Sequence, residues 1–190
     1  LGTDLAGAGI GFVDATILGS SQEVDQGEAL VLAGGSEADF LACGDICAAF
    51  AKQVFHLGIC GAGASTKLVV NLVLGLQRLV LAEGMVLGEK AGIDPSQLLK
   101  ILRAGAAYAR VMDTKGDKMA AGEYSAQARL GQHLKDVDLI LDLGQQTATP
   151  LPLSALHAQI LRAGVAQGLG ELDNAAVVEV LRRLAGGGHA

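Results

Sequence analysis

A glycine-rich turn that opens one very long helix-compatible stretch constrains the fold of this chain more than any other feature. The turn covers residues 58–63 (GICGAG), and the helical pattern continues from about Ala64 to Lys90. At about 1.5 Å per residue, this stretch makes a helix of about 40 Å. We therefore expect the remaining segments to be organised around it.

Two polar side chains near the start of this helix point to chemistry. Lys67 and Asn71 are four residues apart, so they lie on the same helix face. A lysine near a helix start is commonly a solvated surface residue, but the neighbours of Lys67 are almost all aliphatic. A half-buried cation beside an amide is suited to donate a proton or to stabilise a developing oxyanion.

Composition excludes several classes of function. The chain has 190 residues, of which 51% are apolar and only 3% aromatic, so we expect an aliphatic core in one domain, or in one domain and a fragment of another. The formal net charge is −6, and no run of Lys or Arg forms the basic face that nucleic-acid binding needs. This charge is typical of a soluble, acidic cytoplasmic protein.

No membrane segment, signal peptide or metal site is predicted. The most apolar run, residues 72–81, is interrupted by Gln77 and Arg78, whereas a spanning helix needs roughly 20 apolar residues. Cys43, Cys47 and Cys60 give an odd count without metal-ligand spacing. They predict buried, reduced thiols.

The expected strands all precede the glycine turn and most of the expected helices follow it, so the expected fold class is mainly α. Strands are expected over residues 10–16, 29–33 and 53–57, with one helix from Ser36 to about Phe50. Six helices are expected after the glycine turn, over residues 64–90, 95–105, 110–121, 126–147, 152–168 and 174–184. The boundary would divide an α/β part, residues 1–62, from an all-helical part, residues 63–190. Three short strands do not make a stable sheet alone, so we do not expect Leu1 to be the natural start.

The glycine clusters do not fit a dinucleotide fingerprint, which places G-x-G-x-x-G between a strand and a helix. The cluster at residues 7–11 precedes a strand, and the spacing in residues 58–63 is reversed. The second cluster is better interpreted as a tight turn that brings the backbone close to another group.

The pattern Gly58-x-x-Gly61-x-Gly63-x-x-x-Lys67-x-x-x-Asn71 resembles the catalytic motif of the β-hydroxyacid dehydrogenases. This family includes 3-hydroxyisobutyrate dehydrogenase and, more distantly, 6-phosphogluconate dehydrogenase. Further segments resemble the family in matching order from about Gly11 onward, namely residues 12–15 (FVDA), 134–139 (LKDVDL), 150–153 (PLPL) and 168–173 (GLGELD).

The resemblance implies a two-domain enzyme that binds NAD or NADP and acts on a small-molecule substrate. The chain would hold the last three strands and one helix of the α/β cofactor domain, and the whole all-α C-terminal domain of a 6-phosphogluconate dehydrogenase-like fold. It implies that Lys67 is the general acid/base and that Asn71 holds the substrate and orients the lysine. Lys135 and Gly61 would face the cofactor, although Lys135 followed by Asp136 is also typical of a solvated pair.

The substrate loop departs from the family pattern. The family usually reads Asp-Ala-Pro-Val-Ser-Gly-Gly, and residues 14–20 here read DATILGS. Leu18 replaces the serine and cannot donate a hydrogen bond, which leaves Ser20 and the backbone N–H groups of Gly19 and Ser20 to hold a substrate anion.

The resemblance implies hydride transfer between a nicotinamide cofactor and a small hydroxy acid, or its semialdehyde or keto form. Two alternatives stay open, namely an imine or non-acid carbonyl reductase, motivated by Leu18, and a non-catalytic helical dimerisation module. We expect a homodimer or a higher homo-oligomer, and neither activity nor tight dinucleotide binding from this chain alone. His56, His133 and His157 are interpreted as structural or surface residues.

Overall fold

The structure is a computed structural model that describes residues 2–186, without the side chain of Thr3. The described residues form two compact units that meet between Val70 and Asn71. This boundary lies inside one continuous helix, α5 (Ala62–Lys90). Each unit is described separately below.

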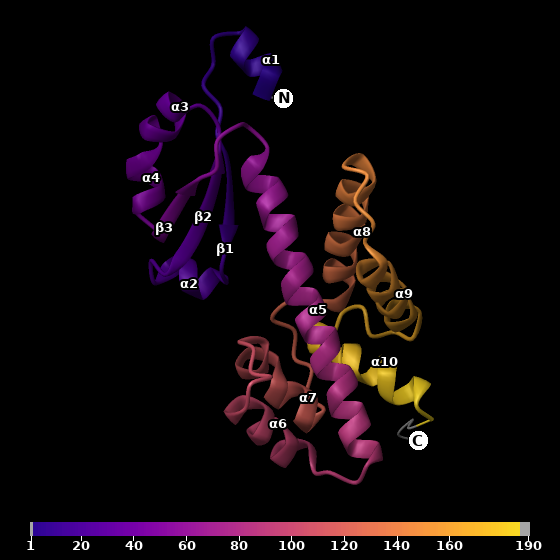
Figure 1. Cartoon of the computed structure of the whole chain (residues 1–190). Coiled ribbons are helices and arrows are strands. Elements are labelled where there is room, and N and C mark those ends of the chain that lie inside the picture. The colour runs from indigo at the N-terminus through magenta and orange to yellow at the C-terminus, as the bar shows by residue number, and fades with distance from the viewer. Residues whose placement is uncertain (1, 187–190) are drawn as a thin grey trace. The chain divides into compact units, whose positions relative to one another are not determined.

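The first unit contains a three-stranded sheet, β1 (Asp14–Leu18), β2 (Ala29–Gly34) and β3 (Ala51–His56). The strands lie in the order β1-β2-β3, with β1 antiparallel to β2 and β2 parallel to β3 (Figure 1). All three expected strands are present, although β1 begins at Asp14 and not at residue 10. The parallel pair needs a crossover, which α3 (Glu37–Ala42) and α4 (Gly44–Ala48) provide.

The expectation of a single helix before α5 is wrong. The stretch from Ser36 divides at Cys43 into α3 and α4, and α1 (Gly2–Gly7) and α2 (Ser21–Asp25) precede them. The polar segment that contains α2 was expected to be a loop, but Ser20 and Glu23 form a capping box that starts a helix there. The helices α3 and α4 cover one side of the sheet, where Cys47 packs against Val31 and Ala33.

The long helix is confirmed, since α5 continues for 29 residues without interruption. By length and composition alone it is apolar enough to cross a membrane, but the core helix of a soluble protein passes the same test. In its most apolar window, 39% of the residues are buried inside the chain. The expectation that no segment crosses a membrane therefore remains a prediction.

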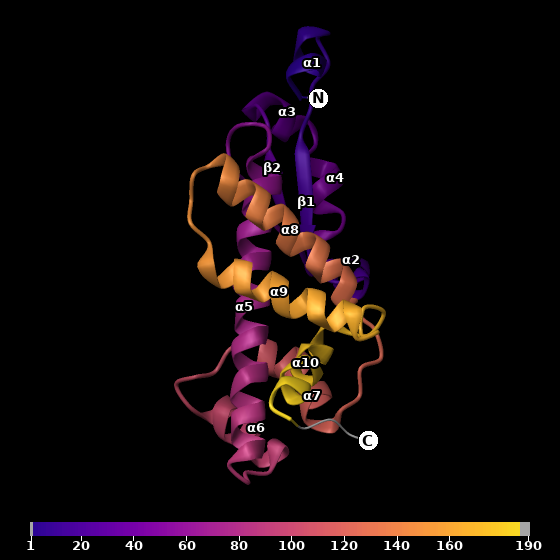
Figure 2. The same cartoon turned by 90° about the vertical axis from the view of Figure 1, so that its right-hand side faces the viewer.

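The second unit is built from helices packed on the C-terminal part of α5. Figure 2 shows α8 (Leu130–Gln146) and α9 (Pro152–Ala166) side by side. The other elements are α6 (Pro95–Ala104), the π-helix η1 (Met112–Gly116), α7 (Asp117–Ala121), the 3₁₀ turn η2 (Asn174–Ala176) and α10 (Val177–Leu184). Within the described range this unit has no strand, and an isolated bridge joins Arg129 to Asp173. The mainly helical class is confirmed.

The core of the second unit is aliphatic, as expected. Fully buried side chains from six helices meet in it, including Met85, Leu99, Met119, Leu130, Val137, Leu161 and Val180. The cysteine prediction is only partly correct, because Cys47 is buried while Cys43 is half-buried and Cys60 is exposed. Among residues 2–186, no three side chains of the metal-binding types gather into a site.

Candidate functional site

Lys67 lies on the second turn of α5 and is half-buried. Within the described part of the chain, its ammonium group has no ion-pair or hydrogen-bond partner. Asn71 follows one turn later on the same continuous helix. The helix therefore carries an unpaired cation and an amide on one face, as the spacing predicts.

The start of α5 is fixed by the carboxylate of Asp14. Its two oxygens accept hydrogen bonds from the backbone N–H groups of Gly61, at 2.6 Å, and Ala64, at 2.9 Å. A carboxylate at a helix N-terminus satisfies free N–H groups and interacts favourably with the helix dipole. The hydroxyl of Thr16 also donates to the carbonyl oxygen of Gly63 at 3.0 Å. The strand β1 thereby fixes the turn of the helix that precedes Lys67.

Gly63, the last glycine of the turn, packs against the sheet of its own unit. A side chain at Gly63 would collide with the carbonyl oxygen of Leu32 and lie 2.6 Å from that of Asp14. A side chain at Gly34 would lie 2.5 Å from the carbonyl oxygen of Ile59. The N–H of Gly61 already donates a hydrogen bond to Asp14. The predicted contact between Gly61 and the cofactor would therefore have to involve other atoms of this residue, and it stays a prediction.

Residues 14–18 of the predicted substrate loop form β1, so only its last two residues lie outside the strand, at the end opposite to Asp14. Leu18 ends the strand, and Ser20 is the N-cap of α2. The backbone N–H and the hydroxyl of Ser20 both donate to the Glu23 carboxylate, at 2.7 and 3.0 Å. A substrate carboxylate at Ser20 would have to displace a group of the same charge. The roles of Leu18, Gly19 and Ser20 stay predictions.

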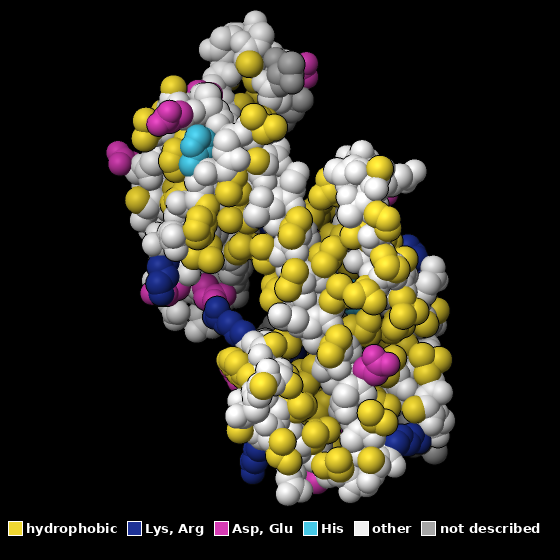
Figure 3. All heavy atoms as spheres, viewed as in Figure 1, with side chains coloured by type: hydrophobic (Ala, Val, Ile, Leu, Met, Phe, Trp, Pro, Cys, Tyr) yellow, Lys and Arg dark blue, Asp and Glu magenta, His cyan; other side chains and the backbone are white. Residues whose placement is uncertain are grey.

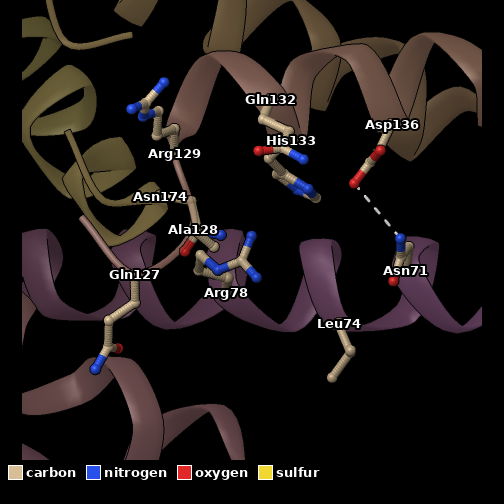
Figure 4. A pocket seen from close by; sticks show the side chains of 10 residues that line it. All are labelled: Asn71, Leu74, Arg78, Gln127, Ala128, Arg129, Gln132, His133, Asp136 and Asn174. Atoms are coloured by element: carbon tan, nitrogen blue, oxygen red, sulfur yellow. Dashed lines mark hydrogen bonds between the residues drawn. The ribbon is translucent and has the colours of Figure 1, made fainter. Parts of the chain in front are cut away.

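Asn71 lines a pocket of about 300 Å³ in the second unit. Its side-chain amide faces Asp136 of α8, with 3.5 Å between Nδ2 and Oδ2 (Figure 4). The lining is mostly polar and is drawn from α5, from α8 and from the segments before α8 and α10. It consists of Asn71, Leu74, Arg78, Gln127, Ala128, Arg129, Gln132, His133, Asp136 and Asn174.

Arg78 is the residue of this pocket that sequence reasoning missed. It lies on α5 and is 9% exposed, and among residues 2–186 its Nε and Nη1 atoms have no hydrogen-bond partner. Burial lowers the pKa of its guanidinium to about 10, against an opposing effect of Asp173, so the group remains a cation at neutral pH. The sequence signal was a cation within an apolar helix, two turns after Asn71.

Two buried imidazoles lie near Arg78. Burial, followed by the charge of Arg78, lowers the pKa of His133 to about 2 and that of His157 to about 4. Both rings are therefore neutral at physiological pH. They fit against α5 because Gly75 has no side chain, and a Cβ there would lie 2.8 Å from Nε2 of His133. The interpretation of both residues as structural agrees with this burial.

Asp173 anchors the segments around the pocket and is fully buried. It caps η2 through the N–H of Ala175, and both of its oxygens accept from Lys115 at 2.9 Å. Burial acts to raise the pKa of this carboxyl group, but the hydrogen bonds from Lys115 and from the backbone hold it at about 2. Asp173 therefore both caps η2 and forms an ion pair with Lys115.

Lys135 lies on α8 with an exposed side chain. In residues 2–186 its ammonium group has no partner, whereas the neighbouring Asp136 faces Asn71. An unpaired cation on α8 suits the binding of a negatively charged cofactor group. It equally suits a solvated side chain, so its cofactor role stays a prediction.

Comparison with known families settles the relationship. The family model described as "NAD-binding of NADP-dependent 3-hydroxyisobutyrate dehydrogenase" matches residues 61–181. The chain belongs to the 3-hydroxyisobutyrate dehydrogenase family. The model described as "NAD binding domain of 6-phosphogluconate dehydrogenase" matches residues 1–58. The cofactor class of the family is NAD or NADP, as the resemblance implied.

Individual members of the family cover nearly all of this chain. It is 33% identical over 179 residues to 2-(hydroxymethyl)glutarate dehydrogenase from Eubacterium barkeri, a match to 94% of the chain and 60% of the relative. It is 33% identical over 178 residues to glyoxylate/succinic semialdehyde reductase 1 from Arabidopsis thaliana, with 94% and 62% covered. The chain thus spans about three fifths of the length of these relatives.

The fold is also that of the family. A crystal structure of 3-hydroxyisobutyrate dehydrogenase from Salmonella typhimurium superimposes with a TM-score of 0.86 at 26% identity. The match covers 94% of this chain and 63% of that one.

Proposed function

We propose that this chain is part of an NAD(P)-dependent dehydrogenase or reductase that interconverts a small hydroxy acid with its semialdehyde or keto form. The observation that supports this most is the unpaired Lys67 at the Asp14-capped start of α5, one turn before Asn71. The relatives support the same class, since their names describe a hydroxy-acid dehydrogenase and a semialdehyde reductase.

In the proposed reaction, Lys67 handles the proton. The bound nicotinamide supplies the hydride during reduction and accepts it during oxidation. During reduction the ammonium group of Lys67 donates a proton to the carbonyl oxygen, and during oxidation the neutral amine takes the proton from the hydroxyl. Asn71 donates from its amide to the substrate and, four residues from Lys67, restricts the positions that the lysine adopts.

We also propose that the chain contains parts of two domains with different roles. Residues 1–62 belong to the Rossmann-type cofactor domain, and residues 63–190 form the helical domain of a 6-phosphogluconate dehydrogenase-like fold. The glycine turn supports this division, because the hydrogen bond from Gly61 to Asp14 and the close packing of Gly63 join the start of α5 to the sheet. We expect this chain alone to be inactive and to bind NADH or NADPH more weakly than low-micromolar.

The catalytic role is tested in the protein extended to the full length of its relatives. We expect Lys67→Ala to lower kcat by roughly 100-fold or more, because general acid/base catalysis contributes about that much. Lys100→Ala removes an exposed lysine of α6 and serves as the matched control. Steady-state NAD(P)H absorbance measures both. Normal turnover by Lys67→Ala would disprove the mechanism.

The substrate class is tested with the same enzyme and a panel of 3-hydroxy acids, uncharged aldehydes and imines. We expect the highest kcat/KM for an acid, because a cationic Lys67 disfavours a cationic iminium substrate. A preference for imines would favour the alternative that Leu18 motivates.

A further inference from the structure

The pocket that begins at Asn71 contains a buried cation that the proposed proton transfer does not use. Arg78 lies seven residues further along α5, on nearly the same helix face and about 10 Å away along the axis. Both residues line the same pocket. We propose that this pocket receives the second carboxylate of a dicarboxylate substrate and that Arg78 recognises it. This inference rests on the proposed function, since it names the substrate class of the site that holds Asn71.

The first support is the unsatisfied state of Arg78. Its side chain is nine-tenths buried, and in residues 2–186 its Nε and Nη1 atoms have no hydrogen-bond partner. A buried charge without a partner is strongly unfavourable, so such groups are nearly always paired in proteins. Guanidinium groups form strong, charge-assisted hydrogen bonds with carboxylates. The pocket thus contains unused donors for an anion.

The second support is a surplus of positive charge around Arg78. The carboxylate that acts on it through space is Asp173, whose oxygens are bound by Lys115 at 2.9 Å. Lys118 lies 3.6 Å from the same carboxylate. One carboxylate therefore serves three cations. An anion beside Arg78 would restore the balance.

The third support is the polarity of the lining. Figure 4 shows Asp136 directed at Asn71, and Arg78 further along the pocket near Gln127, Ala128 and Asn174. Arg129, at the rim, is exposed and paired with Glu171 at 3.3 Å. The acidic group therefore lies at the Asn71 end, and both arginines lie away from it. A dicarboxylate held at Asn71 would place its second carboxylate toward Arg78.

His133 is a second candidate donor beside Arg78. Its Nε2 atom is buried and, in the described range, unpaired, and the ring is neutral. The tautomer with hydrogen on Nε2 would donate to the same carboxylate. The unpaired Oδ1 of Asn174 is an acceptor and is suited to a hydroxyl group or a water molecule.

The test compares glutarate with butyrate and inorganic phosphate, using calorimetry on this chain. The variants are Arg78→Met and the control Arg162→Met, which removes an exposed arginine of α9 outside the pocket. We expect glutarate to bind the unmodified chain at least tenfold more tightly than butyrate. Arg78→Met should lose at least tenfold in glutarate affinity, and Arg162→Met should retain it.

A second measurement separates ligand recognition from a structural role. If Arg78 serves to bind a ligand, its unpaired buried charge does not stabilise the ligand-free fold. The variant Arg78→Met without ligand should then unfold at the same urea concentration as the unmodified chain or at a higher one. Glutarate should then stabilise the unmodified chain and not the variant. A lower unfolding midpoint for Arg78→Met, or equal glutarate binding by both, would overturn the inference. Phosphate binding as tight as that of glutarate would overturn the dicarboxylate assignment.

These readouts do not depend on turnover. If Lys67→Ala retains activity, the proposed mechanism fails while the Arg78 measurements still decide the anion subsite. If Arg78→Met binds glutarate normally, the subsite fails and the role of Lys67 is unaffected.

Discussion

The imidazoles of His133 and His157 are held neutral by burial and by the neighbouring charge of Arg78. In the unfolded chain each ring binds a proton once the pH falls below about 6.5. In the folded chain His157 binds one only near pH 4, and His133 only near pH 2. Between these values the unfolded state binds more protons than the folded state, so acid weakens the fold.

We therefore expect the free energy of unfolding to be constant above about pH 6.5 and to fall as the pH decreases toward 4. Each histidine contributes a slope on the order of 1 kcal/mol per pH unit. Urea denaturation at several pH values measures it. Protonation of Asp173 lowers the free energy of unfolding only below about pH 4, because its pKa of about 2 lies below the ordinary value of 3.8.

The substitution His157→Gln should remove part of this slope. An unchanged slope in His157→Gln would show that the histidine is not the source.

Single residues were predictable where a polar group interrupts a local pattern. Lys67 and Asn71 stood out because they lie on an otherwise apolar helix. Arg78 carries the same signal, because it also interrupts the apolar pattern of this helix. Its environment was not predictable, because Asp173 and Lys115 reach it from distant parts of the chain. The capping box of Ser20 and Glu23 is also predictable from their spacing in the sequence.

At the scale of elements, α5 depends on one glycine for its contact with α8 and α9. A Cβ at Gly75 would lie 2.8 Å from Nε2 of His133 and 3.0 Å from Cε1 of His157. At Gly84, on the same helix, a Cβ would meet no atom within 4 Å. Close packing therefore requires a glycine at position 75, whereas position 84 has room for a side chain.

We expect Gly75→Ala to destabilise the fold by about 1–3 kcal/mol through overpacking. Gly84→Ala should stabilise it by up to about 1 kcal/mol, because alanine favours the helix. Chemical denaturation measures both. Equal effects of the two substitutions would contradict the packing described for the histidines.

The helix boundaries were best predicted where capping residues mark them, as at Asp94 and Pro95 before α6. They were least accurate over residues 110–121, where the structure has a π-helix followed by α7. Lys115 lies in that π-helix and pairs with Asp173. A distant contact of this kind leaves no local signal in the sequence.

At the scale of the whole molecule, exposed apolar side chains indicate a missing partner. Hydrophobic side chains are spread over much of the second unit in the view of Figure 3. On α5 alone, Val80 is 67% exposed and Leu87 is 70% exposed. Contiguous apolar surface of this kind marks interaction sites. We propose that the occupant is a second copy of this chain, as a homodimer or a higher homo-oligomer.

Light scattering after size-exclusion chromatography should give at least twice the chain mass at micromolar concentration. Val80→Glu should shift the protein toward the monomer, because it places a charge within the apolar surface. Ile46→Glu, at an exposed position of the first unit, is the control. A monomeric mass for the unmodified chain would contradict this proposal.

The close packing around the glycine turn also limits which substitutions this sequence can accept. At Gly34 and Gly63, an added side chain would meet carbonyl oxygens of the main chain as well as the carboxylate of Asp14. A substitution elsewhere can reshape a neighbouring side chain, but it cannot remove a peptide carbonyl. A side chain at either glycine would therefore have to displace the backbone at the start of α5. These two positions should be the most invariant ones in any population of descendants that keeps this helix start.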